Sequence, residues 1–385
     1  MKMKKNLKII AALDSFQGAA SSYDAGCAVR RGIQKRFPDA EITVFSLGDG
    51  GEGTSAAFFR AGTVCTHSVS DTHRTPVDAK YVLLDKNGVK TAMFDMAAAA
   101  GLHHSRAHGL DIRTATTAGV GELIVHLAES GCGEIIVGLG GSGTNDGGIG
   151  ALTSMGAEFY DISGKKLDGT GGAAVLSEIA VCDLSAVHHL LKGIKLTLLY
   201  DVAVPLTGEF GASRMFSRQK GADDRTMEEL EVAMTHFAEI GDRYSGEAVS
   251  VKKGAGAAGG LGYGLSLAGG ILHPGAEYVL DFVGFREVLA HADLVITGEG
   301  KTDRQTAQGK LPFTVARYAR EAGVPVLGLC GTFAPDASLY KDGFDAVFSI
   351  INAPSSLEEC MAMTESLLEN AAYNAAGFFA AVKSR

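Results

Sequence analysis

Proline is scarce in this sequence, with 8 residues of 385, whereas glycine is abundant, with 51. Low-complexity linkers are not expected from this composition, which instead indicates many tight glycine turns between strands and helices. Hydrophobic residues make up 46% and charged residues 21%, a balance that permits a large buried core and excludes a disordered chain. A chain of this length suggests two domains of roughly 100–200 residues each.

Basic residues are fewer than acidic ones, 35 against 44, which gives a net charge of −9. Surfaces that bind nucleic acids or anionic membranes need an excess of Lys and Arg, so neither partner is expected. No apolar run approaches the roughly 18 residues of a membrane span. The apolar run 9–13 is too short for a signal peptide and is followed directly by Asp14.

The six cysteines are scattered along the chain without a C-x-x-C pair. In a chain of this size, that spacing predicts reduced, mostly buried thiols and a cytoplasmic protein.

Strands and helices alternate at both ends of the chain. Residues 7–13 and 42–47 predict buried parallel strands, and Ser21 or Ser22 can cap a helix between them. The alternation of strands and helices returns from residue 293 onward. There the pattern predicts strands at 294–297, 326–330 and 346–351 and helices around 313–322 and from 356.

In the middle of the chain the hydrophobic pattern changes to an alternation with a period of two residues. Residues 77–96 alternate around an Asn-Gly turn at 87–88, which predicts a β-hairpin. The expected fold class is therefore α/β, with two domains. The first is a Rossmann- or flavodoxin-like parallel-sheet domain built from both chain ends, residues 1–75 and 285–385. The second is an inserted mixed α/β domain, residues 76–284, which holds the hairpin and most glycine-rich loops.

Acidic residues directly follow several predicted strands. These residues are Asp14, Asp49, Asp201, Glu299 and Asp303. Ligands of open α/β sheets bind at the carboxyl ends of the strands, so these positions indicate a binding site.

The glycine-rich segment GDGGEGT at 48–54 contains the carboxylates of Asp49 and Glu52. Backbone N–H groups in such a segment are open to an anion, and carboxylates hold Mg²⁺ directly or through water. The segment therefore indicates a metal–phosphate site. The alternative is that each Asp caps the following helix and each Gly only permits a turn.

Two further glycine motifs bear on nucleotide binding. Residues 138–143 match the dinucleotide fingerprint G-x-G-x-x-G after a predicted strand at 134–137. The following TNDGG at 144–148 is better suited to hydroxyl, phosphate or metal contacts. GKT at 300–302 resembles the end of a P-loop, but Val295 stands where the first glycine is required. An ATP site would therefore be of another kind.

Two other classes of site have little support. His104 and His108 have the spacing of a helical zinc pair, but Ser105 stands where the zinc-protease motif needs Glu. Surface or core histidines are favoured over a zinc site. No G-x-S-x-G is present, which argues against a serine hydrolase.

Taken together, seven blocks resemble the bacterial glycerate kinase family of the glyoxylate and sugar-acid pathway type, in order along almost the whole chain. They are DSFQG (14–18), DGGEGT (49–54), GVGELI (119–124), GGSGTNDGG (140–148), QKGA (219–222), GAGAAGGLG (254–262) and TGEG (297–300), the last extended by Asp303, Gln305, Gly309, Lys310 and Pro312. The resemblance implies two α/β domains, the first made from both chain ends. It also implies transfer of the ATP γ-phosphoryl group to a hydroxyl of D-glycerate, with Mg²⁺.

The chain departs from the family pattern at several positions. Gln17 replaces the usual Lys, Asp95 the usual Glu, Ala100 the usual Ser and Val204 the usual Asn, and residues 300–305 read GKTDRQ instead of GRLDGQ. Loss of a Lys near the phosphates removes a point charge that could stabilise the transferring group. Lys301, Arg304 and Lys310 are the candidates to replace it.

The resemblance and the strand-end positions together assign roles. Asp201 and Asp303 are expected to bind Mg²⁺ or to orient and deprotonate the substrate hydroxyl, and Asp49 is the third catalytic candidate. The expected substrate- and nucleotide-binding residues are Asp14, Ser15, Gly50, Gly51, Glu52, Gly53, Ser142, Thr144, Asn145, Asp146, Lys220, Gly298, Glu299, Gly300, Gln305 and Lys310. Arg74, Lys220 and Lys310 are candidates for binding the glycerate carboxylate.

Three alternatives stay open: a kinase for another small hydroxy acid, a non-catalytic relative that binds a ligand, and, more remotely, an NAD(P)-dependent oxidoreductase based on residues 138–143. The sequence does not choose between 2-phosphoglycerate and 3-phosphoglycerate as product, nor does it fix the oligomeric state.

Overall fold

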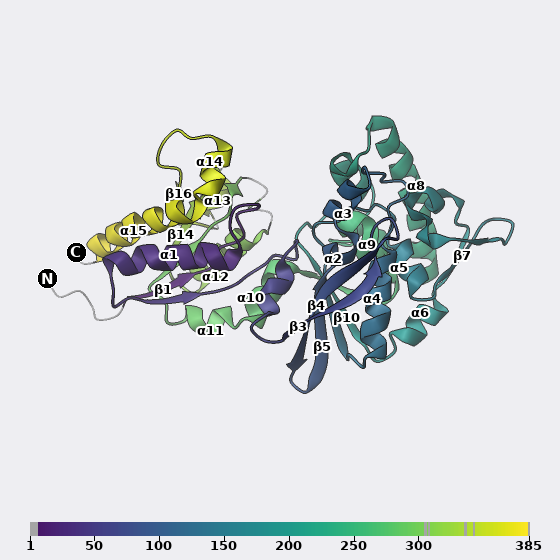
Figure 1. Ribbon diagram of the computed structural model, residues 1–385, viewed down its shortest axis with the longest axis horizontal. Helices are drawn as coiled ribbons and strands as arrows, with labels where there is room; N and C mark the ends of the chain where they lie inside the picture. Colours follow the sequence, from purple (N-terminus) through teal and green to yellow (C-terminus); the bar gives the residue numbers. More distant parts are fainter. Residues whose placement is uncertain (1–6, 304–305, 307–308, 335–336, 342, 384–385) are drawn as a thin grey trace. The chain divides into compact units, whose positions relative to one another are not determined.

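The computed structural model describes residues 7–303, 306, 309–334, 337–341 and 343–383. The chain divides into two compact units (Figure 1). The first unit combines Met1–Asp49 with Ala276–Arg385, and the second is the continuous segment Gly50–Gly275. Each unit has a hydrophobic core of its own. In the described part of the chain, none of the helices combines the length and apolar character needed to cross a membrane.

The first unit is built on a five-stranded parallel sheet in the order β16-β14-β12-β1-β2. The strands of this unit are β1 (Lys8–Ala11), β2 (Glu41–Val44), β12 (Leu294–Thr297), β13 (Lys301–Thr302), β14 (Val326–Cys330), β15 (Thr332–Phe333) and β16 (Ala346–Ser349). Its helices are α1 (Ser22–Arg36), α10 (Gly275–Phe282), α11 (Phe285–Leu289), α12 (Leu311–Glu321), α13 (Ala337–Lys341), α14 (Leu357–Ala362) and α15 (Thr364–Lys383). The short strands β13 and β15 pair with each other in parallel.

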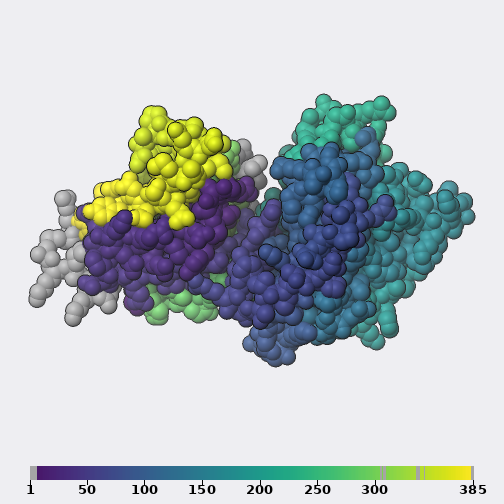
Figure 2. Space-filling view, in the orientation of Figure 1, coloured from purple at the N-terminus to yellow at the C-terminus, as the bar shows by residue number. Residues whose placement is uncertain are grey.

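Helix α1 shows how the sequence sets the ends of an element. Ser21 caps it by accepting a hydrogen bond from the N–H of Asp24 at 3.1 Å, and the helix stops shortly before Pro38. Helix α1 packs along α15, and Arg31 forms salt bridges to Glu365 and Glu369 across the pair. The beginning and the end of the chain therefore form one unit, visible as adjacent purple and yellow surfaces in Figure 2.

The second unit is built on a six-stranded mixed sheet in the order β11-β10-β6-β5-β4-β3. Its strands are β3 (Thr63–Ser70), β4 (Pro76–Lys86), β5 (Val89–Asp95), β6 (Glu134–Gly138), β10 (Lys195–Tyr200) and β11 (Ile271–Pro274), with β7 (Glu158–Tyr160), β8 (Lys166–Leu167) and β9 (Val181–Asp183) in a separate three-stranded sheet. Strands β5, β6, β10 and β11 are parallel, whereas β4 is antiparallel to both β3 and β5. The carboxyl ends of the four parallel strands therefore lie along one edge.

Helices and 3₁₀ turns fill the connections of the second unit. The α-helices are α2 (Ala97–Ala100), α3 (Leu102–Ala107), α4 (Ala118–Glu129), α5 (Ile149–Ser154), α6 (Ser185–Leu190), α7 (Ala212–Phe216), α8 (Asp224–Ser245) and α9 (Leu261–Leu267). The 3₁₀ segments are η1 (Thr54–Phe58), η2 (Gly169–Glu178), η3 (Arg218–Lys220), η4 (Val249–Val251) and η5 (Ala257–Gly260). The predicted hairpin is present as β4 and β5, with Asn87 and Gly88 at φ of 56° and 82° in its turn.

The unit boundaries differ from the expected domain boundaries after residues 75 and 284. Strand β3 pairs with β4 over eight residue pairs, so residues 50–75 join the second unit. At the other end, residues 276–284 join the first unit through α10. Strand β3 has no buried residue before Val69, which is why its sequence lacks a clear strand pattern.

Both ends of the second unit lie at one point of its own sheet. Pro274, at the end of β11, is in parallel register with Tyr200, at the end of β10. A Cβ atom added to Gly50 would lie 2.8 Å from the carbonyl carbon of Tyr200. The chain therefore enters and leaves this unit beside the same residue.

Candidate functional site

Polar residues of the second unit gather at the carboxyl ends of β5, β6 and β10. Asp95, the last residue of β5, is in register with Gly138, the last residue of β6, and Gly138 is in register with Leu199 of β10. The glycine-rich loop 139–148 follows β6, and the half-buried Asp201 follows β10. The parallel pairing of β5, β6 and β10 thus brings these segments to one edge of the sheet, where ligands of α/β proteins bind.

The loop of residues 50–54 packs directly on the glycine-rich loop. The N–H of Gly140 donates to Gly50 O at 2.9 Å. A Cβ atom on Gly140 would lie 2.2 Å from Gly51 Cα, so only glycine permits this approach. The Glu52 side chain lies beside Gly141, with Oε2 2.7 Å from the place of an added Cβ. The loop runs directly into the short 3₁₀ turn η1.

Asp95 is a buried carboxylate at this edge that the sequence analysis did not place in the site. It is 8% exposed and accepts hydrogen bonds from Ser55 N at 3.2 Å and from Ser55 Oγ at 2.7 Å. Burial raises the pKa of Asp95 to about 6, and the charge of Glu52 acts in the same direction. Its position at the end of a strand was the signal that could have identified it.

Lys220 lies beneath the glycine-rich loop, where the short helices α7 and η3 place it. Its side chain is 2% exposed, and Nζ donates to Ser142 Oγ at 2.7 Å and to Thr144 O at 2.7 Å. Gly221, at φ of 100°, ends η3 directly after it. Burial lowers the pKa of Lys220 to about 7, and the charge of Asp146 opposes that shift.

Several buried oxygens around Lys220 have no hydrogen-bond partner. They are Thr144 Oγ1, Asn145 Oδ1 and Ser217 Oγ. Asn145 is held on its other side, where Nδ2 donates to Ser213 Oγ at 3.0 Å. An unsatisfied buried polar group costs roughly 1–3 kcal/mol, so this cluster is suited to a polar ligand or to ordered water. Ser213 and Ser217 were not predicted as site residues, because nothing in their local sequence marks them.

Asp146 holds the loop in place. Its carboxylate accepts hydrogen bonds from Thr117 N and Oγ1, both at 2.8 Å, from Gly148 N at 3.0 Å and from Gly150 N at 3.3 Å. These bonds tie the glycine-rich loop to the starts of α4 and α5. A loop and not a helix follows Gly143, so residues 138–143 lack the helix that a dinucleotide fingerprint requires.

A second group of predicted residues lies at the carboxyl edge of the first unit. Asp14 follows β1, Asp49 follows β2, and Glu299 follows β12. Ser22 Oγ donates to Leu13 O at 2.7 Å and accepts from Leu47 N at 2.9 Å, which joins two of these strand ends. The N–H of Asp14 donates to Gly298 O at 2.8 Å, which adds the third.

Burial and neighbouring negative charge raise the pKa of two of these carboxylates, Asp14 and Glu299. Burial raises the pKa of Asp14 well above its ordinary value, and the charges of Asp49 and Glu299 add to the effect. Burial also raises the pKa of Glu299, which accepts from Thr306 Oγ1 at 2.6 Å and lies 3.6 Å from Lys310 Nζ. Lys310 lowers the pKa of Asp14 and of Glu299, so it acts as a cation within this acidic group.

The acidic group of the first unit fits Mg²⁺, which binds through one or two carboxylates together with waters and substrate phosphates. Over the described ranges, no three His, Cys, Asp or Glu side chains form a ready-made metal site. A metal that takes its remaining ligands from phosphates and water does not need one.

Asp303 and Asp201, the predicted metal ligands, belong to different units. Asp303 lies 3.2 Å from Lys301 Nζ, and its N–H donates to Thr306 Oγ1 at 3.1 Å. Ser15 and Gly300 lie at the same edge as Asp14 and Glu299. Gln305 and Arg304 fall outside the described residues.

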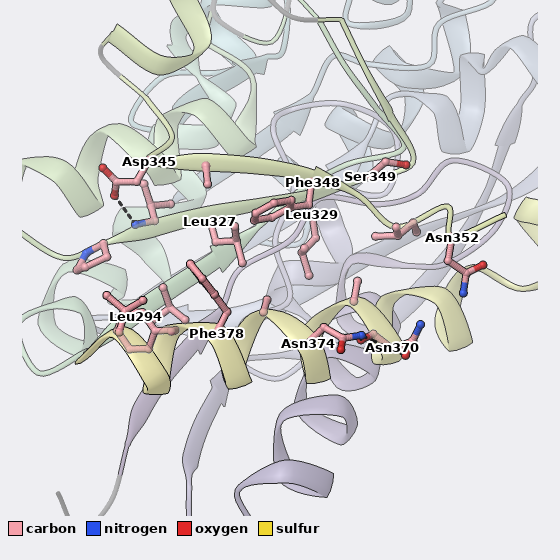
Figure 3. Close-up of a pocket in the computed structure, with 18 of the residues that line it drawn as sticks. Leu294, Leu327, Leu329, Asp345, Phe348, Ser349, Asn352, Asn370, Asn374 and Phe378 are labelled. Atoms are coloured by element: carbon pink, nitrogen blue, oxygen red, sulfur yellow. Dashed lines mark hydrogen bonds between the residues drawn. The ribbon is translucent and has the colours of Figure 1, made fainter. Parts of the chain in front are cut away.

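An apolar groove of about 720 Å³ lies elsewhere in the first unit, between α15 and strands β14 and β16 (Figure 3). Leu327, Leu329 and Phe378 are among its lining residues. Asn374 Nδ2 donates to Asn370 O at 3.0 Å, and Asp345 accepts from the N–H of Val326 at 2.8 Å. No Lys or Arg occurs among the described residues that line it, so a phosphate or carboxylate ligand fits the strand-end groups better.

The fold and these groups define an α/β protein with polar, anion-compatible sites at the carboxyl ends of parallel strands. The chain belongs to the glycerate kinase family, whose model matches residues 9–380.

Known proteins resemble the chain over nearly its full length. A glycerate kinase of Bacillus cereus is 40% identical over 374 residues, which cover 96% of this chain and 97% of the relative. A glycerate 2-kinase of Escherichia coli is 35% identical over 357 residues, 92% of this chain and 93% of the relative. The crystal structure of a glycerate kinase 2 from Salmonella typhimurium LT2 is similar with a TM-score of 0.82 at 36% identity, covering 99% of this chain and 100% of that one.

Proposed function

We propose that the protein transfers the γ-phosphoryl group of ATP to a hydroxyl of D-glycerate. The observation that carries this proposal is the buried polar cluster around Lys220, in a chain of the glycerate kinase family. Unpartnered oxygens beside a buried amine suit a small ligand that has both hydroxyls and a carboxylate. The names of the Bacillus and Escherichia relatives support the same acceptor.

Each unit supplies one part of the proposed chemistry. Ser142, Thr144 and Asn145 would bind the acceptor, with the loop of residues 50–53 beside them. Asp14, Ser15, Glu299, Lys310 and the glycines at 298 and 300 would bind the phosphates of the nucleotide in the first unit. Asp49 would contribute its charge to that group.

The mechanism is positioning and charge neutralisation, because phosphoryl transfer asks for little covalent work from the protein. When bound, Mg²⁺ would neutralise charge on the transferring phosphates. Asp303 in the first unit and Asp201 in the second are our two separate candidates for holding it. We propose that Asp201 also orients the acceptor hydroxyl and accepts its proton; its position at the strand end beside the glycine-rich loop supports this role.

The loss of the usual Lys at position 17 has a proposed compensation. Gln17 is exposed, whereas Lys310 acts electrostatically on both Asp14 and Glu299. Lys301 lies against Asp303. Lys310 therefore fits best as the cation that faces the phosphates.

Turnover tests the proposal directly. ADP release from Mg-ATP should depend on D-glycerate and should be slower with L-glycerate, with other hydroxy acids and without acceptor. Consumption of the product by enolase alone would identify 2-phosphoglycerate. Preferred turnover of another hydroxy acid would replace D-glycerate as the substrate, and ligand binding without turnover would favour a non-catalytic relative.

Asp201→Asn should lower kcat by at least about 10³-fold, because it removes both a metal-binding oxygen and a proton acceptor while keeping the shape of the side chain. Asp183→Asn, at the exposed end of β9, is the matched control and should keep wild-type kcat. Circular dichroism should show an unchanged fold in both variants. An Asp201→Asn enzyme with wild-type kcat would remove Asp201 from this role.

We also propose a cytoplasmic location. All six cysteines are free thiols in the structure, which supports a reducing compartment.

A further inference from the structure

Lys220 is almost completely buried, and its ammonium group already makes two hydrogen bonds within the protein. A lysine that binds a ligand directly is expected to be more exposed and to have more of its N–H donors free. The exposed fraction is 2% for Lys220 and 8% for Ser142, the residue whose hydroxyl it contacts. An ammonium group has three N–H donors, and two of those of Lys220 go to Ser142 Oγ and Thr144 O, both at 2.7 Å. The lysine is therefore buried and bonds to the loop, which leaves at most one of its N–H donors for another partner.

The bond from Lys220 fixes the role of the Ser142 hydroxyl. A serine hydroxyl has one hydrogen to donate and can accept through its lone pairs. Because Ser142 Oγ accepts from Lys220, its own hydrogen is available to a further acceptor. A cationic donor also polarises the hydroxyl and strengthens the hydrogen bond that it gives.

The backbone around Ser142 is held rigidly. Gly101 and Ser142 form an isolated antiparallel bridge. On either side of it, Leu102 N donates to Gly141 O at 2.8 Å and Gly143 N donates to Ala100 O at 2.9 Å. Ser105 Oγ donates to Gly143 O at 3.0 Å, and a Cβ atom on Gly143 would lie 2.3 Å from Ser105 Oγ. The Ser142 hydroxyl is thus held in position before any ligand binds.

We infer that Lys220 is a positioning residue that acts through Ser142, whose hydroxyl it orients to donate to an oxyanion of the bound substrates. This inference rests on the proposed function and deepens it. The oxyanion is either the carboxylate of the hydroxy-acid acceptor or a phosphate oxygen of the nucleotide. Both have the same hydrogen-bonding chemistry, and the co-substrate whose KM changes distinguishes them.

The charge of Lys220 gives this arrangement a pH dependence. Burial lowers the pKa of Lys220 to about 7, and Asp146 on the neighbouring loop favours the charged form. The cations on the adjoining short helices are engaged elsewhere, Arg214 with Glu228 and Arg218 with Asp224. As pH rises through about 7, Lys220 loses its proton and polarises Ser142 less. The affinity for the oxyanion should fall, and Lys220→Arg should remove that fall because guanidinium stays charged.

Steady-state kinetics of Ser142→Ala, Lys220→Met and the double variant test the inference. Loss of a hydrogen bond to an anion should raise the KM of one co-substrate by about 10–100-fold, while the KM of the other stays within about twofold. The double variant should be no worse than the more impaired single variant, because both remove the same interaction. Ser250→Ala, with a serine also 8% exposed, and Lys86→Met, which removes one of the two lysine partners of Glu134, are the matched controls and should keep both KM values.

Three results would overturn the inference: unchanged KM values in Ser142→Ala, fully additive effects in the double variant, or a pH profile that is the same in the wild type and in Lys220→Arg. If Lys220→Met does not fold, the KM values of Ser142→Ala and the pH profile still test the inference.

Failure of the proposed function gives a different pattern, in which the wild type does not turn over D-glycerate. Calorimetric titration of D-glycerate and of Mg-ATP into the wild type and Ser142→Ala then tests the inference by itself. Equal affinities, or no binding of either compound, would overturn it.

Discussion

Asp95 illustrates how a single residue at the site is costly to the fold. Its carboxylate is buried, and hydrogen bonds from Ser55 only partly offset the loss of water, so its pKa rises to about 6. An acid whose pKa is higher in the folded state stabilises the fold below its unfolded pKa of about 3.9, and this contribution is lost as pH rises through the folded value. At neutral pH the protein therefore carries a charged group that its surroundings disfavour.

Asp95→Asn should be more stable than the wild type at pH 7.5, by on the order of 1–2 kcal/mol, because the amide removes the buried charge and still accepts from Ser55. The difference should be about half as large at pH 5, below the folded pKa of about 6, and should vanish only below the unfolded pKa of about 3.9. Urea unfolding at the two pH values measures it. Asp95→Glu, which keeps the charge, is the control. An equal difference at both pH values would show that the charge of Asp95 is not the cause.

Site residues that reach the cluster around Lys220 only through tertiary packing could not be predicted from the sequence. Ser142, Thr144 and Asn145 stand in a recognisable glycine-rich block, and the structure places them together with Lys220. Ser213 and Ser217 reach the same cluster only because α7 folds against the glycine-rich loop. Their neighbours in sequence, Arg214 and Met215, give no hint of it.

At the scale of elements, the fully buried strands were the most predictable. Strands β12 and β14 have the predicted bounds, and β6 is one residue longer than predicted, because each is a continuous apolar run between turn signals. Strands β3 and β9 were not predicted. Strand β3 has no buried residue before Val69 and β9 has only three residues, so no hydrophobic period marks them.

The approach of the two glycine-rich loops depends on Gly140. Gly140→Ala places a methyl group 2.2 Å from Gly51 Cα and must push the loops apart. Overpacking of this kind costs about 1–3 kcal/mol, and the displacement should lower kcat/KM by at least about tenfold. Thermal melting and steady-state kinetics measure the two effects. In the control Gly133→Ala, the added methyl meets only the end of the Val89 side chain, so activity should persist. Wild-type kinetics in Gly140→Ala would show that the contact is not required.

At the scale of the whole molecule, the second unit has both a complete sheet and a hydrophobic core of its own. Its sheet and its hydrophobic core come entirely from residues 50–275. A domain with its own core can in principle fold alone. The proposed acceptor-binding residues, including Ser142 and Lys220, lie within it.

A fragment of residues 50–275 should therefore fold and unfold cooperatively. D-glycerate should raise its Tm, because a ligand that binds only the folded state stabilises it. Thermal melting followed by circular dichroism, with and without D-glycerate, measures both effects. The same fragment carrying Ser142→Ala is the control and should show a smaller rise. A fragment without a cooperative transition would show that the second unit depends on the rest of the chain.

The meeting of Gly50 and Pro274 beside Tyr200 also has a genetic consequence. A coding segment whose two ends meet in the folded product can be gained or lost as a cassette, because its host needs only one short bridge across the join. By that logic the second unit can be removed after β2 without breaking the five-stranded sheet of the first unit. Joining codon 49 to codon 276 through a brief glycine-rich bridge would leave the coding sequence of that sheet uninterrupted.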